Sequence, residues 1–154
     1  MDNMITNKQK YETYKVLKGK LAKALENGFW LEATMIEYAI MEDRLSSILD
    51  HARICTNAYD KSKKFRNKLN SISLQIGKKH PAIDGKITPE LLDEIDRWRD
   101  DRNTLVHRSC LRVYNSEEVK ALAETGKTLV DQLINAAKRV GTRCKKLYGE
   151  EDDI

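Results

Sequence analysis

The apolar residues of this chain recur three or four positions apart over most of its 154 residues, which is the spacing of one face of an α-helix. Pro81, Pro89, Gly28 and Gly85 fall between the periodic segments. Proline is excluded from helix interiors because it lacks an N–H and clashes with the preceding turn. The chain is therefore predicted to be all-α, an up-and-down bundle of about five helices.

The first three helices are expected over residues 8–26, 30–55 and 62–77. Asn27 and Gly28 provide a stop signal for the first helix. The second is apolar around most of its circumference, which is typical of a central helix. The third is basic at its start and apolar later.

The last two helices carry clear start signals. Thr88 is a favourable N-cap for the fourth helix, with Pro89 at the first helical position. Asn115 and Glu118 have the spacing of a capping box for the fifth. The fifth helix has an apolar stripe that indicates packing in the core of a bundle, with a seam between two copies as the alternative. The stripe comprises Val119, Leu122, Gly126, Leu129, Leu133, Ala136, Val140 and Leu147.

Length and composition favour one soluble domain over residues 1–149, followed by a frayed acidic tail, 150–154. Hydrophobic residues make up 40% and charged residues 34% of the chain, which is typical of a globular, helix-rich protein. No apolar run is long enough to cross a membrane, and no export signal is evident. Cys55, Cys110 and Cys144 are odd in number and far apart, which indicates a reducing, cytoplasmic setting without a zinc site.

Basic residues occur in two runs that could attract an RNA backbone. A solvated helical face is the alternative for each run. The candidates for RNA contact are Lys61, Lys63, Lys64, Arg66 and, in the fourth helix, Arg108. Lys68 completes the first run, and the second comprises Lys138, Arg139, Arg143, Lys145 and Lys146.

A permanent cation interrupts the apolar stripe of the fourth helix. Steps of four, three, four and three residues join Leu91, Ile95, Trp98, Arg102 and Leu105. An arginine on an inward-facing stripe costs free energy unless something pairs with it, so Arg102 is a candidate site residue. The structural alternative is an ion pair between Arg102 and a core carboxylate, with a surface histidine at position 107.

Asn103 and His107 supply further chemistry beside Arg102. Histidine moves protons near neutral pH, arginine offers a planar fork for phosphate oxygens, and asparagine can orient a neighbour. On a regular helix Arg102 and His107 point about 140° apart. They can meet if the helix loosens near His107, or across the axis of a symmetric dimer.

The segment Arg102–His107, with a polar residue directly after the arginine, resembles the Arg-x(4–6)-His motif of the HEPN superfamily of small all-α domains. Its position late in the chain, before one long helix, matches that family too. The resemblance implies a dimeric, metal-independent endoribonuclease of a toxin or phage-defence system that leaves 2′,3′-cyclic phosphate ends. In that role Arg102 stabilises the phosphate, His107 does acid–base work and Asn103 supports them.

The resemblance also implies RNA as substrate, a homodimer, no cofactor and an antitoxin or regulatory RNA as a further partner. Ser109 stands where one toxin branch has a modified tyrosine, although Tyr114 lies nearby; this argues against that branch's antitoxin. The alternatives are a catalytically inactive HEPN-like scaffold that binds RNA or protein, and an unrelated helical bundle with a chance motif.

Glu37 and Glu42 are the candidate supporting carboxylates, because both lie inside the most apolar helix. A carboxylate on a buried face requires a cation or hydrogen-bond donors, which Arg102 or Arg44 could supply. We therefore expect at least one of the two to approach the motif. Salt bridges on the helix surface are the alternative for both.

Overall fold

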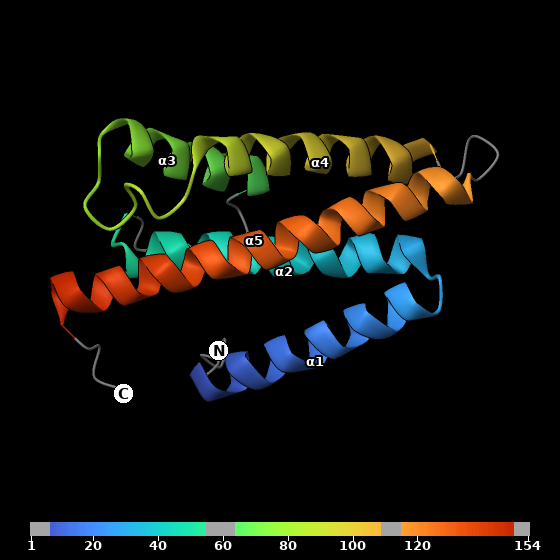
Figure 1. Cartoon of the computed structure of the whole chain (residues 1–154), viewed down its shortest axis with the longest axis horizontal. Helices are drawn as coiled ribbons and strands as arrows, with labels where there is room; N and C mark the ends of the chain where they lie inside the picture. The colour runs from blue at the N-terminus through green and yellow to red at the C-terminus, as the bar shows by residue number, and fades with distance from the viewer. Residues whose placement is uncertain (1–6, 55–63, 109–114, 150–154) are drawn as a thin grey trace, which may run out of the picture.

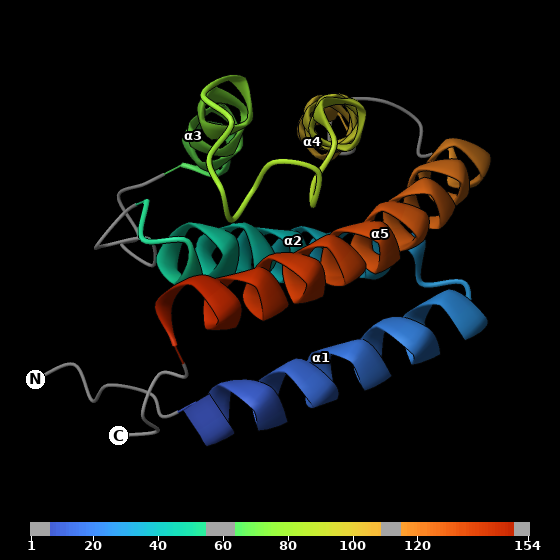
Figure 2. The same cartoon turned by 60° about the vertical axis from the view of Figure 1, so that its left-hand side comes forward.

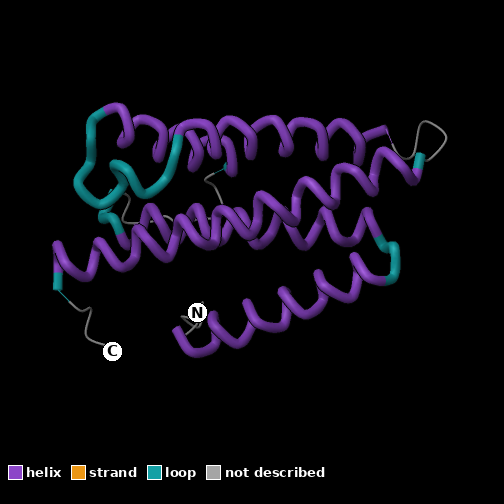
Figure 3. Tube along the Cα trace, in the orientation of Figure 1, coloured by secondary structure: helices purple, strands orange, loops and turns teal. Residues whose placement is uncertain are grey.

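Five helices form the described part of the protein, and the all-α prediction is confirmed. The computed structural model describes residues 7–54, 64–108 and 115–149. Figure 3 shows this part of the chain as helices joined by loops. The helices are α1 (Asn7–Glu26), α2 (Trp30–His51), α3 (Phe65–Gly77), α4 (Pro89–Arg108) and α5 (Ser116–Tyr148).

The helices are arranged in three layers, with α2 and α5 side by side in the middle (Figures 1 and 2). Helix α1 covers one side of this layer, and α3 and α4 lie on the other. Helix α2 packs against α1, α3 and α5, which confirms that the helix with the most apolar circumference is central. Both α2 and α5 bury ten residues each.

The alternation of helix directions is broken once, between α2 and α3. Tyr38 of α2 contacts Phe65 of α3, and Glu42 one turn later pairs with Lys68. Because the contacting positions increase together, α3 runs parallel to α2. Helix α4 then returns in the opposite direction, as Figure 1 shows. This arrangement places the start of α3 beside the middle of α2.

The predicted helix ends agree with the structure where a cap is present. Thr88 Oγ1 accepts a hydrogen bond from Leu91 N at 3.2 Å. Asn115 Oδ1 accepts from the backbone N–H groups of Glu117 and Glu118. The sequence predicts the end of α2 near Cys55, but the helix ends at His51, and Arg53 just beyond it adopts a left-handed conformation with φ of 57°.

The α3–α4 connection contributes to the core instead of lying only on the surface. Ala82, Ile83 and Ile87 are buried. Arg139 and Arg143 of α5 donate hydrogen bonds to the carbonyls of Lys86 and Pro81. Two members of the second basic run therefore hold this loop in place.

The stripe of α5 packs mainly into the core, as the sequence predicted. Only its terminal residue, Leu147, is exposed, and Leu122 is half-buried. Trp98 of α4 is 2% exposed, and its indole Nε1 donates to Leu122 O at 2.9 Å. Trp98 is thus the core anchor that holds α4 against α5.

Candidate functional site

Arg102 lies on the inward stripe of α4, where the sequence placed it. Its side chain is half-buried, and the guanidinium carbon lies 4.4 Å from the centre of the Tyr38 ring. Arg102 Nη1 donates to Asn103 Oδ1 at 3.1 Å. Tyr38 in turn contacts Phe65, with ring centroids 4.8 Å apart. A cation over an aromatic face in such a setting contributes about 1 kcal/mol.

No carboxylate of the described residues forms an ion pair with Arg102. The expected pairing with a core carboxylate is therefore absent from that part of the chain. In addition, Arg102 Nε is buried without an acceptor, which costs about 1–3 kcal/mol. The fold thus leaves the positive charge of Arg102 without a neutralising partner there.

His107 lies in the last turn of α4, with its side chain exposed. Helix α4 stays α-helical through Arg108, so the suggestion that it loosens near His107 is wrong. Arg102 and His107 of one copy consequently point about 140° apart. Asn103 is half-buried between them and contacts only Arg102 of the two through a hydrogen bond.

Glu37 is buried in the core and does not pair with Arg102. It is 0% exposed, and neither carboxylate oxygen has a hydrogen-bond partner. Burial raises the pKa of Glu37 to about 9, opposed only by the charge of Lys127. The carboxyl group is therefore neutral at pH 7, and the alternative of a surface salt bridge is wrong for Glu37.

Glu42 pairs with Lys68, at 3.5 Å between Oε1 and Nζ. Lys68 is only 4% exposed, so this member of the first basic run points inward and not to solvent. Neither supporting carboxylate reaches Arg102 directly. Glu42 instead affects Tyr38, the aromatic partner of Arg102. Burial and then the charge of Glu42 raise the pKa of the Tyr38 hydroxyl, while Arg102 and Arg99 lower it.

The residue that sequence reasoning missed is Tyr38. Its place among the apolar residues of α2 marked it only as part of the core. The available signal was the aromatic ring itself, because the face of a tyrosine is a suitable partner for a cation without a carboxylate.

Three of the five candidate residues for RNA contact lie in the described part of the chain. Lys64, Arg66 and Arg108 have exposed side chains. Lys61 and Lys63 lie outside the described residues, as do Ser109 and Tyr114. Arg99, 12% exposed, pairs with Asp96 and Asp100 of its own helix.

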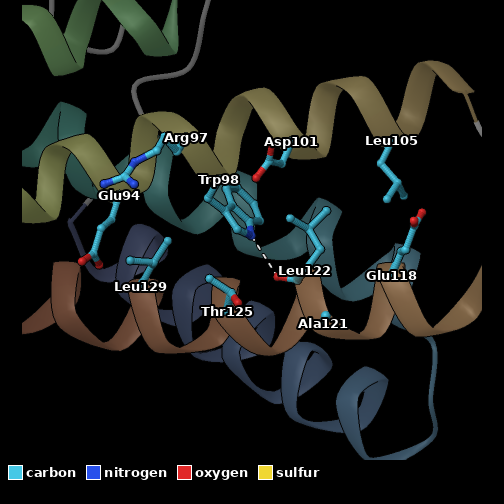
Figure 4. Close-up of a pocket in the computed structure, with 10 residues that line it drawn as sticks. All are labelled: Glu94, Arg97, Trp98, Asp101, Leu105, Glu118, Ala121, Leu122, Thr125 and Leu129. Atoms are coloured by element: carbon cyan, nitrogen blue, oxygen red, sulfur yellow. Dashed lines mark hydrogen bonds between the residues drawn. The ribbon is translucent and has the colours of Figure 1, made fainter.

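A cleft of about 520 Å³ lies between α4 and α5, and Trp98 and Leu105 of the α4 stripe help to line it (Figure 4). Its floor is largely apolar, with Trp98 hydrogen-bonded to Leu122 across it. Its charged lining consists of three carboxylates and one arginine: Glu94, Asp101, Glu118 and Arg97. This cleft does not include the motif residues, and its net negative charge disfavours an RNA phosphate.

Within residues 7–54, 64–108 and 115–149, no helix combines the length and hydrophobicity needed to cross a membrane. In the same ranges, no three His, Cys, Asp or Glu side chains gather into a cluster suited to a metal ion.

Comparison with known proteins returned no matching family model, no matching curated protein and no matching solved structure. The side-chain geometry around Arg102 therefore carries the functional argument.

Proposed function

We propose that the protein is a HEPN-type endoribonuclease of a toxin or phage-defence system, with Arg102 and His107 as its catalytic residues. The observation that carries the proposal is the unneutralised Arg102: a half-buried guanidinium with an unpartnered Nε and no carboxylate among the described residues. A cation maintained in this way is available to a phosphate group.

The divergence of Arg102 and His107 on α4 supports a site shared between two copies. Because Arg102 and His107 of one copy diverge by about 140°, one protomer does not direct both side chains at the same phosphate. No described helix covers the outer side of α4 in Figure 2, and the side chain of His107 is exposed. In the proposed dimer, a two-fold axis near the C-terminal end of α4 brings His107 of the partner subunit to the solvent-accessible part of the half-buried Arg102 side chain.

The proposed reaction uses the ribose 2′-hydroxyl as nucleophile. His107 takes the 2′-proton, the 2′-oxygen bonds to phosphorus, and the bond from phosphorus to the 5′-oxygen breaks. The histidine then returns the proton to that leaving oxygen. Arg102 stabilises the charge on the phosphate, Asn103 holds Nη1 of Arg102, and Lys64, Arg66 and Arg108 contact the RNA backbone. The products are a 2′,3′-cyclic phosphate and a 5′-hydroxyl.

RNA cleavage in the presence of a metal chelator tests this proposal. Arg102→Ala and His107→Ala should each reduce the cleavage rate by about 100-fold or more. Arg97→Ala and His51→Ala are matched controls, because Arg97 and His51 are exposed residues outside the motif; both variants should cleave at the wild-type rate.

Two results would contradict the proposal. Equal cleavage by the wild type and both motif variants would place the activity elsewhere. A folded wild type that binds RNA or a protein partner but cuts no RNA would favour the inactive scaffold instead.

A further inference from the structure

The Tyr38 ring contacts both the guanidinium of Arg102 and the ring of Phe65. The Arg102 guanidinium carbon is 4.4 Å from the Tyr38 centroid, and the Phe65 centroid is 4.8 Å from it at an interplanar angle of 35°. Three helices thus meet at one stack, since Tyr38 belongs to α2, Phe65 to α3 and Arg102 to α4. Phe65 is 2% exposed, so core packing holds in place the ring that Tyr38 contacts.

The stack and one hydrogen bond restrict different motions of the guanidinium. Contact with the Tyr38 face limits the tilt of the guanidinium plane. The hydrogen bond from Nη1 to Asn103 Oδ1, at 3.1 Å, limits its rotation within that plane. An arginine side chain otherwise has many rotamers, and ordering them costs free energy when a ligand binds.

We propose that Tyr38 is a positioning residue that pre-orients Arg102 for a phosphodiester, with Asn103 as its second restraint. The proposal rests on the proposed ribonuclease function. Tyr38 itself takes no part in bond making, and the face of its ring is what matters. The hydroxyl is therefore dispensable and the aromatic ring is not.

Close to Tyr38 and Arg102, the helices that carry these residues pack into the core. Trp98 precedes Arg102 by four residues on α4, and Glu37 precedes Tyr38 on α2. A Cβ built on Gly126 of α5 would lie 2.7 Å from Glu37 Cδ and 2.8 Å from Trp98 Nε1, so α2, α4 and α5 converge there. This contact fixes the separation of the helices that carry Tyr38 and Arg102.

Tyr38→Phe and Tyr38→Leu separate the ring from its hydroxyl. The Phe variant should keep wild-type cleavage within about threefold. The Leu variant should lower kcat by about 100-fold, because a misplaced reacting group costs that much. Phe65→Leu keeps the Tyr38 side chain but removes the ring that supports it, so kcat should fall by about 10-fold. This variant tests the inference if Tyr38→Leu does not fold.

The NMR signal of the Arg102 Nε–Hε group gives a readout independent of activity. It should be sharp and dispersed in the wild type and in Tyr38→Phe, and averaged towards the free-arginine position in Tyr38→Leu. Wild-type kcat, or an unchanged Arg102 signal, in a folded Tyr38→Leu protein would overturn the inference. If the wild type cuts no RNA, the proposed function is wrong, and so is the role of Tyr38 in positioning Arg102 for catalysis. The NMR signal then still decides whether the ring holds Arg102.

Discussion

At the residue scale, Arg102 and Glu37 show two solutions to burying an ionisable group. Arg102 remains charged, because guanidinium groups do not lose their proton in proteins, and an aromatic face substitutes for a carboxylate. Glu37 has no such partner and becomes neutral, with a pKa raised to about 9 by burial. Each solution has a measurable consequence.

The neutral Glu37 predicts a pH-dependent stability. Its folded-state pKa of about 9 lies above the ordinary value of 4.5, so its contribution is fully present below pH 4.5 and is lost as the pH rises towards 9. From about pH 6 to about pH 8, the wild-type free energy of unfolding should fall relative to that of Glu37→Gln by up to about 1.4 kcal/mol per pH unit.

Urea unfolding at several pH values measures this difference. Glu32→Gln is the matched control, because Glu32 is an exposed glutamate of the same helix and its removal should leave the wild-type pH dependence intact. Parallel pH profiles for the wild type and Glu37→Gln would show that Glu37 is ionised in the folded protein.

At the element scale, the contact of α2 with α5 depends on a glycine. Gly126 is buried, and a Cβ there would collide with the Glu37 carboxyl group and Trp98 Nε1. Both obstacles are core side chains, with Glu37 0% and Trp98 2% exposed. The close approach of the two central helices therefore requires the absence of a side chain at position 126.

Gly126→Ala should lower the free energy of unfolding by about 1–3 kcal/mol, the usual cost of overpacking a core. Gly141→Ala on the same helix has nothing within 4 Å of its new Cβ, so improved helix propensity should raise stability by up to about 1 kcal/mol. Chemical denaturation compares the two. A stabilising Gly126→Ala would mean that Glu37 moves aside freely.

The start of α5 depends on a side-chain cap. Asn115 Oδ1 accepts from two backbone N–H groups of the first turn. Asn115→Ala should therefore cost about 1 kcal/mol of stability. Asn135→Ala, at an exposed position inside the same helix, should be neutral or slightly stabilising because alanine is the better helix former. Equal thermal midpoints for both variants would contradict the capping role.

At the scale of the whole molecule, the acidic cleft, Arg102 and His107 occupy different parts of the α4 surface. Three carboxylates line the cleft that α4 forms with α5. Arg102 lies towards α2, and His107 faces solvent at the end of the helix. In the proposed dimer, the C-terminal end of α4 meets the second copy, where the Arg102 side chain is half-buried and His107 is exposed.

A shared site predicts complementation between two inactive variants. Arg102→Ala and His107→Ala, mixed under conditions that exchange subunits, should recover up to about a quarter of wild-type cleavage, because half of the dimers are mixed and each has one intact site. If Arg102 and His107 of the same copy formed the site, the mixture would remain inactive. Double substitution of one partner abolishes the recovery and is the control.

The sequence by itself determined the helices and the inward position of Arg102. Apolar spacing, Thr88 and Asn115 are local signals, and they define α4 and α5 because helix formation and capping involve residues only a few positions apart. The same periodicity placed Arg102 on the stripe of Trp98, where it is half-buried.

Only the tertiary structure decided what surrounds Arg102. The sequence offered Glu37 and Glu42 as partners, but Glu37 packs against Gly126 and Glu42 pairs with Lys68. Tyr38 takes their place because α3 runs parallel to α2 and supports the ring with Phe65. The physical reason is that periodicity gives the face of a helix on which a side chain lies, whereas the partner it meets depends on the direction and separation of the neighbouring helices.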